Sequence, residues 1–242
     1  MSRPMGGPLL EIDAVTKRFG GFLALDRVSI QVRAGERLGL IGPNGSGKTT
    51  LINCVSGALP TDGGRILFDG RDITALPAHQ RTRLGIVRSF QIPKPFTSMT
   101  VMENLGIPLE YAAHARSHGA ADALEILRAI GLDAKAGLRP TGLTQIEMRK
   151  LELARAMAAR PKLLISDEAM AGLSSAEVDD ILAILFRLNE SGITIIMIEH
   201  IMRAVMRFSQ RVVVLDAGTR IAEGTPEEIV RNPAVEKAYL GE

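Results

Sequence analysis

Several features that the sequence lacks exclude whole classes of protein. Cys54 is the only cysteine, so neither an internal disulfide nor a cysteine-rich zinc site can form. The longest apolar runs, such as 193–198 and 212–215, have the length of strands and fall far short of the roughly 18 residues that a membrane-spanning helix needs. Residues 1–8 contain no apolar segment typical of a secretory signal. We therefore expect a protein that stays in the cytosol and does not cross a bilayer.

An excess of one charge sign is also missing. The 29 Lys and Arg residues are balanced by 27 Asp and Glu residues, which leaves a net charge of +2 and no block of like charges. Nucleic-acid binding usually requires a basic excess or a basic block, so no nucleic-acid partner is expected. Hydrophobic residues make up 46% and charged residues 23% of the 242 residues, which is typical of a globular domain with room for a substantial insertion.

The apolar pattern predicts an α/β fold. Residues 9–15 and 28–32 indicate an N-terminal antiparallel β region. Buried strands separated by helical stretches predict a parallel sheet covered on both faces. These strands are expected at 37–41, 85–90, 162–166, 193–198 and 211–215. Because the periodicity becomes helical between the second and third of them, we predict a core of 1–101 and 160–242 with an inserted helical subdomain of 102–159.

A glycine-rich loop at 42–49 has the pattern Gly-x-x-x-x-Gly-Lys-Thr and joins an apolar strand to a helix that begins near Lys48. Glycines in such a loop let backbone N–H groups curl around a polyphosphate. Lys48 is expected to reach the terminal phosphates and Thr49 to offer its hydroxyl to Mg²⁺, while the helix directs its dipole at the anion. A simple glycine-rich turn is the alternative, which the flanking strand and helix disfavour. The residues expected at the nucleotide are Gly42, Asn44, Gly45, Ser46, Gly47, Lys48, Thr49 and Thr50.

Two adjacent carboxylates, Asp167 and Glu168, follow the apolar strand 162–166. Ligands of open α/β sheets bind at the carboxyl ends of the strands. Asp167 is therefore expected to hold Mg²⁺ through water, and Glu168, which points elsewhere, to polarise the water that attacks a γ-phosphate. An Asp-Glu pair is otherwise a common solvated helix start, but downstream of a phosphate loop the catalytic interpretation is favoured.

Two polar residues end neighbouring strands in the same way. His200 follows strand 193–198 and is expected at the same edge as Asp167, where it would contact the γ-phosphate and orient the attacking water. Gln91 ends strand 85–90 and is expected to sense Mg²⁺ and the γ-phosphate as a neutral group. A purely structural histidine and an uninformative surface glutamine are the alternatives.

Phe19 precedes Gly20 and Gly21 and so offers an aromatic ring on a turn. An exposed aromatic face at this place is suited to stacking on adenine. The alternative is a partly buried turn residue without a ligand.

The order of these features resembles the ATPase subunit of ABC transporters over essentially the whole chain. Within that superfamily, four stretches are similar to bacterial ATPases of branched-chain amino acid importers, namely 17–26, 88–93, 223–228 and 238–242. The resemblance implies a P-loop (RecA-like) ATPase core, ATP and Mg²⁺ as ligands, and hydrolysis coupled to transport. The lipopolysaccharide-export ATPase and importers of urea or short amides use similar subunits. A soluble non-transport ABC ATPase and a P-loop kinase are the remaining alternatives.

The segment Leu143-Thr-Gln-Ile-Glu147 departs from the family signature Leu-Ser-Gly-Gly-Gln. Thr144 keeps the hydroxyl, but Ile146 replaces a glycine whose N–H approaches a γ-phosphate across the dimer. Glu147 brings a carboxylate to the helix start, where it can cap the N–H groups that would otherwise attract phosphate. The resemblance thus implies an intact site of its own and an impaired contact to its partner's ATP. A heterodimer with a second ATPase subunit is favoured over a homodimer.

The resemblance also implies further partners. In relatives the segment after the glutamine, here 92–103, lies near the groove that receives a coupling helix of the membrane subunits, and Pro93, Pro95, Phe96 and Met99 suit such docking. Packing between the two subdomains is the alternative. The implied partners are polytopic membrane permease subunits and, indirectly, a substrate-binding protein. The implied location is the cytoplasmic face of the inner membrane.

Overall fold

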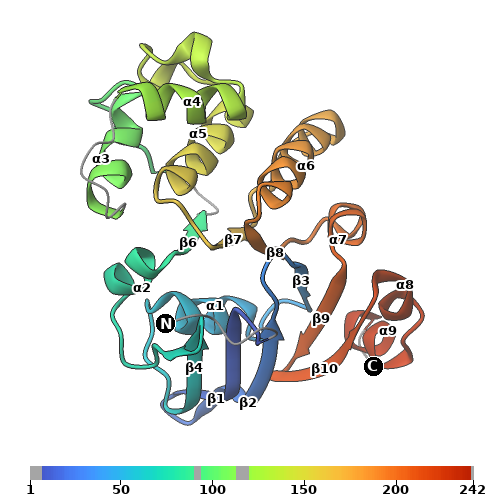
Figure 1. Ribbon diagram of the computed structural model, residues 1–242. Helices are drawn as coiled ribbons and strands as arrows, with labels where there is room; N and C mark the ends of the chain where they lie inside the picture. Colours follow the sequence, from blue (N-terminus) through green and yellow to red (C-terminus); the bar gives the residue numbers. More distant parts are fainter. Residues whose placement is uncertain (1–6, 90–93, 113–119, 241–242) are drawn as a thin grey trace.

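A computed structural model describes residues 7–89, 94–112 and 120–240, and its strands form two sheets (Figure 1). The central sheet has the order β10-β9-β3-β8-β7-β6, and the second has the order β2-β1-β4-β5. The central strands are β3 (Arg37–Ile41), β6 (Ile86–Ser89), β7 (Leu163–Asp167), β8 (Thr194–Ile198), β9 (Arg211–Asp216) and β10 (Thr219–Gly224). The second sheet contains β1 (Leu10–Phe19), β2 (Phe22–Val32), β4 (Gly63–Phe68) and β5 (Arg71–Asp72).

The central sheet is parallel from β9 to β6, and only β10 runs antiparallel at its edge. Successive side chains of its strands enter different cores, because side chains alternate across a strand. On β7, Leu163 and Ile165 join the core under the second sheet, whereas Leu164 joins the core under the helices. Burial on both faces explains why these strands read as unbroken apolar runs. The parallel direction brings the carboxyl ends of β3, β7 and β8 to one edge, as expected.

The antiparallel sheet covers helix α1 (Lys48–Ser56) and one face of the central sheet. Its first two strands are longer than the sequence predicts, because β1 continues to Phe19 and β2 starts at Phe22 around the turn at Gly20 and Gly21. Most of the extra residues are polar or exposed, and the two buried apolar ones, Ala24 and Leu25, are adjacent, so the alternation used for the prediction is lacking. Backbone pairing with register shifts holds them in the sheet.

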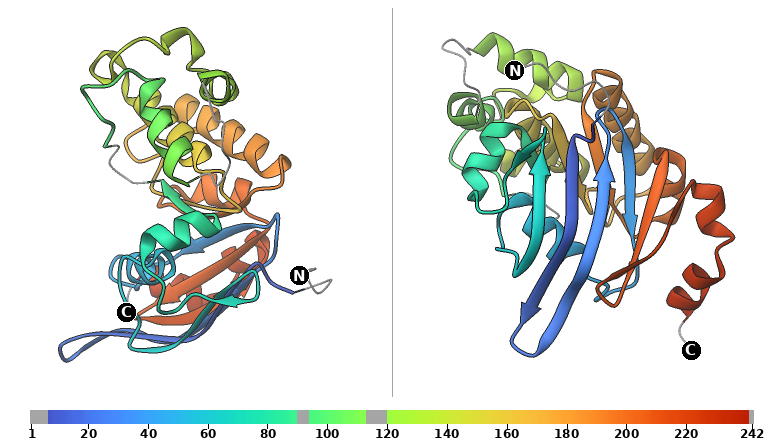
Figure 2. Two further views of the ribbon diagram at one scale, coloured as in Figure 1. Left: turned by 60° about the vertical axis from the view of Figure 1, so that its left-hand side comes forward. Right: turned by 60° about the horizontal axis from the view of Figure 1, so that its bottom comes forward.

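The other face of the central sheet is covered by helices α6 (Ser175–Glu190) and α7 (Met202–Phe208), whose apolar side chains share one core with β7, β8 and β9. Between β6 and β7 the chain forms α3 (Glu103–Ala112), α4 (Ala120–Ile130) and α5 (Gln145–Ala158). These three helices pack on one another and form a lobe apart from the two sheets (Figures 1 and 2). The short helix α2 (Ala78–Leu84) precedes β6. Within the described ranges, no helix combines the length and the apolar character that crossing a membrane requires.

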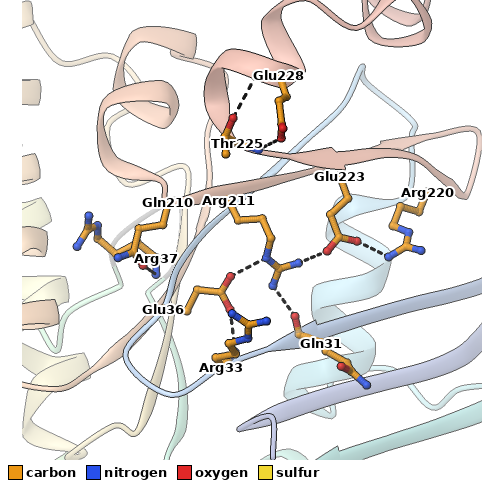
Figure 3. A network of polar contacts seen from close by, with 10 residues as sticks. All are labelled: Gln31, Arg33, Glu36, Arg37, Gln210, Arg211, Arg220, Glu223, Thr225 and Glu228. Atoms are coloured by element: carbon orange, nitrogen blue, oxygen red, sulfur yellow. Dashed lines mark hydrogen bonds and ion pairs between the residues drawn. The ribbon is translucent and has the colours of Figure 1, made fainter. Parts of the chain in front are cut away.

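A polar network ties the C-terminal part of the chain to the amino ends of the central strands (Figure 3). At the start of β9, Arg211 donates from Nε to Glu36 Oε1 at 2.7 Å and from Nη1 to Glu223 Oε1 at 2.5 Å. Its Nη2 reaches the carbonyl oxygen of Gln31 on β2 at 2.5 Å. Helices α8 (Pro226–Val230) and α9 (Pro233–Leu240) follow β10 and pack against it. The network therefore lies at the end of the sheet opposite the carboxyl edge.

Candidate active site

The loop 42–47 connects the carboxyl end of β3 to the start of α1, and two of its glycines are required by shape. Gly42 has a φ of 151°, and a Cβ there would lie 2.1 Å from the carbonyl oxygen of Leu215. Gly47 has a φ of 102°, and a Cβ there would lie 2.8 Å from the carbonyl oxygen of Ala24. Side chains at these positions would collide with the backbone of β9 or β2 and strain the backbone of the loop. The loop therefore has the curled form that backbone N–H groups need to surround phosphate.

The start of α1 fits an anionic ligand. Gly47 at its N-cap makes no side-chain cap, and the first turn of the helix contains no acidic residue, so its leading N–H groups face no carboxylate of their own helix. Lys48 is 7% exposed, and its Nζ donates to the carbonyl oxygens of Gly42 at 2.7 Å and Pro43 at 3.0 Å. Burial lowers the pKa of Lys48, while Glu168 and Asp167 oppose that shift. The ammonium group thus lies in the field of Glu168, the predicted base, and of Asp167, the predicted Mg²⁺ ligand.

Asp167 lies at the end of β7 and is 6% exposed. Its Oδ2 accepts from Arg88 Nε at 3.1 Å and from Arg88 Nη2 at 2.5 Å. The same guanidinium donates from Nη1 to Asn53 Oδ1 on α1 at 2.6 Å. Arg88 therefore links the predicted Mg²⁺ ligand to the helix that begins at the phosphate loop.

Glu168 and His200 lie together at the carboxyl edge of the sheet. His200 Nε2 is 3.1 Å from Glu168 Oε1, and the two side chains are 49% and 22% exposed. The backbone of Glu168 has a φ of 48°, in the left-handed region, and its N–H donates to the carbonyl oxygen of Ile198 at 2.9 Å. This arrangement brings a carboxylate and an imidazole together, with access to solvent, at the sheet edge from which the phosphate loop also starts.

The segment after Glu168 is held by two buried charged residues. Glu199, which is 2% exposed, accepts the Met170 N–H at Oε1 over 2.8 Å. Arg149 on α5, which is 9% exposed, donates from Nη2 to the carbonyl oxygen of Ala171 at 3.2 Å. Burial raises the pKa of Glu199 to about 7, the N–H of Met170 opposes that rise, and the charge of Glu168 adds to it.

The predicted signature segment starts helix α5 with a capping box. Thr144 Oγ1 accepts the Glu147 N–H at 3.4 Å, and Glu147 Oε2 accepts the Thr144 N–H at 2.9 Å. Lys135 also forms an ion pair with Glu147 at 2.7 Å, and this hydrogen-bonded partner lowers the pKa of the Glu147 carboxyl. The side chain of Ile146 is partly buried against the helical core. The carboxylate thus caps the helix as the sequence predicts, but Lys135 offsets its charge, which the sequence did not indicate.

Phe19 lies at the end of the hairpin formed by β1 and β2, and its side chain is 47% exposed. Lys17 Nζ lies 5.7 Å from the centroid of its ring. Strand β2 continues past Ala24, which lies against Gly47 of the phosphate loop. The ring is therefore on an exposed turn of a hairpin that reaches the loop. Gln91 falls outside the described residues.

A groove lies between the helical lobe and the core, beside β6 and α2. The exposed rings of Phe96 and Tyr111 line it together with the apolar Ile107 of α3. Arg155 of α5 places its guanidinium 5.2 Å from the centroid of the Phe96 ring. Of the docking segment predicted from the sequence, 94–103 is described, and Phe96 is the member that lines this groove; Pro93 falls outside the described residues.

The structure brings the predicted loop, Asp167, Glu168 and His200 to one edge of the central sheet. The sequence reasoning missed three residues that contact this edge or the turn after it, namely Arg88, Arg149 and Glu199. For Arg88 a signal existed, because it is a lone charge in the apolar run of β6. For Glu199 the signal was a carboxylate directly before a histidine that ends a buried strand. For Arg149 the local pattern of α5 gave none, since a charged residue on a helix is usually solvent-exposed.

Comparisons with known proteins agree with this geometry. Residues 25–171 match the family profile described as ABC transporter, and residues 219–242 match the one described as branched-chain amino acid ATP-binding cassette transporter. The high-affinity branched-chain amino acid transport ATP-binding protein BraF of Pseudomonas aeruginosa is 39% identical, covering 98% of this chain and 100% of the relative. Its counterpart LivG of Escherichia coli is 38% identical at the same coverage. An ATP-binding cassette of an ABC transporter solved in its ADP conformation superposes with a TM-score of 0.88 at 34% identity, covering 97% of this chain and 99% of that one.

Proposed function

Since the chain belongs to the ABC transporter family and is an ATPase of a transporter, we propose that it powers the import of branched-chain amino acids or related small amides. Two observations support this cargo class. Residues 219–242 match a family profile described for branched-chain amino acid transporters. The chain also covers almost the full length of relatives named for branched-chain amino acid transport. The cargo is the proposal, whereas the ATPase role follows from the family.

The residues at the carboxyl edge of the sheet have separate roles in this proposal. Lys48 exchanges its bonds to loop carbonyl oxygens for bonds to the terminal phosphates of ATP. Thr49 and Asp167 offer the hydroxyl and carboxylate oxygens that Mg²⁺ prefers, with Gln91 as a further oxygen donor. Mg²⁺, when bound, neutralises charge on the transferred phosphoryl group.

Glu168 is the proposed general base, and His200 holds it in place. The carboxylate accepts a proton from the attacking water, and the imidazole 3.1 Å from Oε1 fixes its orientation. The exposed fractions of both side chains leave room for that water. Phe19 is proposed to stack on the adenine from the hairpin.

The partner ATPase is proposed to be a different subunit. Thr144, Ile146 and Glu147 would face the partner's ATP, and here the capping box already engages the Thr144 hydroxyl and the Glu147 carboxylate. Fewer free groups at this helix start remain for a phosphate. A partner with a standard signature would complete the ATP site of this chain. The ATP bound by the partner would face the altered signature of this chain and would turn over slowly.

The membrane partner is proposed to dock in the groove that Phe96 and Tyr111 line. An apolar groove of this kind fits an amphipathic helix of a permease subunit. Under this proposal the chain is a peripheral subunit on the cytoplasmic face of the inner membrane, and a substrate-binding protein acts on the other side.

The test is transport by the assembled complex in lipid vesicles. With its permeases, partner ATPase and binding protein, the complex should accumulate leucine, isoleucine or valine when ATP is supplied, and the Glu168→Gln complex should not. Accumulation of urea or short amides, without accumulation of the three amino acids, would identify small amides as the cargo. Outward transport, or purification of the chain from cells without any polytopic membrane partner, would reject it.

A further inference from the structure

The turn that follows Glu168 is fixed from two different parts of the molecule. Glu199, at the end of β8, accepts the Met170 N–H at 2.8 Å, and Arg149 of α5 donates to the carbonyl oxygen of Ala171 at 3.2 Å. Within the turn, the Ala171 N–H donates back to the carbonyl oxygen of Glu168 at 3.3 Å. The core and the helical lobe thus both hold the backbone that carries Glu168.

Glu168 needs such support because its backbone is strained. Its φ of 48° lies in the left-handed region, which a side chain other than glycine, asparagine or aspartate seldom adopts. Strained residues persist where the surrounding contacts determine them. The hydrogen bond between Glu199 and the Met170 N–H holds the backbone only two residues after Glu168. It is therefore among the nearest of these contacts.

Packing alone does not explain a carboxylate at position 199. Glu199 is 2% exposed, and burying a charged group is unfavourable unless hydrogen bonds compensate it. An apolar side chain would fill this place without that penalty, but it would leave the Met170 N–H, also buried, without an acceptor. The polar atom of Glu199, and not its volume, is what the turn uses.

We propose that Glu199 is a positioning residue for hydrolysis, which holds the turn after Glu168 so that this carboxylate meets the attacking water, and that Arg149 makes the same turn sensitive to the position of α5. The proposal rests on the assignment of Glu168 as the base under the proposed function. Arg149 reaches the turn through Nη2, because its Nη1 is buried and has no hydrogen-bond partner among the described residues.

Protonation of Glu199 modulates this contact. The groups that face its carboxylate are the N–H groups of Met170 and His200, the carboxylate of Glu168 and the guanidinium of Arg149. An ionised acceptor forms the stronger hydrogen bond. Because the pKa of Glu199 is raised to about 7, the turn should be held more firmly above neutral pH, and hydrolysis should increase as the pH rises through this value.

The experiment compares four variants in the assembled transporter. Glu199→Leu removes the acceptor, Glu199→Gln keeps an oxygen acceptor without the charge, and Glu168→Gln removes the base. Glu36→Gln is the matched control, because Glu36 is a carboxylate with 10% side-chain exposure at the opposite end of the sheet. For each variant we would measure kcat and KM for ATP between pH 6 and pH 8.5, ATP affinity by titration and folding by circular dichroism.

Glu199→Leu should lower kcat about tenfold or more, as expected when a base is displaced, with ATP affinity within about twofold of the wild type because the phosphate loop is untouched. Glu199→Gln should fold, keep part of kcat and lose the increase near pH 7. Wild-type kcat together with an unchanged pH profile in both Glu199 variants would overturn the proposal. If Glu168→Gln itself retained turnover, the assignment of the base would fail first. If Glu199→Leu did not fold, the pH profile of Glu199→Gln would decide alone.

Discussion

Arg88 on β6 and Asp167 on β7 form an ion pair in which Nη2 and Oδ2 are 2.5 Å apart. Their side chains are 14% and 8% exposed, so the pair is largely shielded from water. Asp167 is also the residue proposed to hold Mg²⁺. The guanidinium therefore compensates, in this structure, the carboxylate charge that Mg²⁺ would otherwise neutralise.

Arg88→Met should lower the free energy of unfolding by about 3 kcal/mol, because it leaves a buried carboxylate without its partner. Saturating Mg²⁺ and ATP should reduce this loss, since Mg²⁺ would compensate Asp167. Urea unfolding with and without Mg²⁺ and ATP measures both effects. Arg27→Met, which removes an exposed pair with Asp26, is the control and should cost under about 1 kcal/mol. Equal losses for the two variants would contradict the prediction.

Lys48→Ala should weaken ATP binding about tenfold to a hundredfold, because charged hydrogen bonds to the terminal phosphates are lost. Isothermal titration in the presence of Mg²⁺ measures the affinity. Lys162→Ala is the control, since Lys162 pairs with Asp69 on the exposed surface. An unchanged affinity for Lys48→Ala would show that the loop is not the nucleotide site.

Glu168→Gln should bind ATP like the wild type but hydrolyse it about a hundredfold more slowly, because the amide cannot accept the proton of the attacking water. A phosphate-release assay on the assembled transporter measures turnover, and a nucleotide titration measures binding. Turnover at the wild-type rate would mean that another group activates the water.

Ile146→Gly combined with Glu147→Gln should raise the ATPase rate of the isolated chain, since it restores the signature glycine and removes a carboxylate. It should also lower the free energy of unfolding by about 1 kcal/mol, because glycine disfavours the helix and the ion pair with Lys135 is lost, whereas Gln at 147 can keep the capping box. The comparison needs the rate of each form alone and after the partner subunit is added. Vigorous turnover by the unmodified chain alone, without gain from the repair, would rule out two unequal sites.

Glu199→Gln should make stability less dependent on pH. The pKa of Glu199 is raised to about 7 in the folded chain, so the folded state binds a proton that the unfolded state releases near pH 4.5. The resulting stabilisation is complete below that pH and is lost as the pH rises through 7. Between pH 5 and pH 8 the wild type should lose about 2 kcal/mol more than the variant. Urea unfolding of both proteins at the two pH values measures this difference. An equal loss of unfolding free energy in the wild type and the variant would contradict the prediction.

Local chemistry explains how much of the site the sequence predicted. The phosphate loop depends on glycines that no other residue can replace, as at Gly42 and Gly47, and such positions are visible in a single sequence. Asp167 and His200 end apolar runs, so the parallel direction of the strands was enough to place them at one edge. The positions of Phe19 and the predicted capping of Glu147 follow from neighbours within a few residues.

Tertiary structure decided the contacts between distant segments. Arg88 meets Asp167 because β6 lies beside β7. Lys135 meets Glu147 because the segment before α5 folds back on the start of that helix. Arg149 meets Ala171 because α5 packs against the core. Each pair is between 12 and 79 residues apart along the chain. The sequence by itself determined the fold class, the phosphate loop and the carboxyl edge, since these depend on local conformation and periodicity. Which charges compensate one another was decided only by packing, because a charge has no preferred partner until the fold removes it from water.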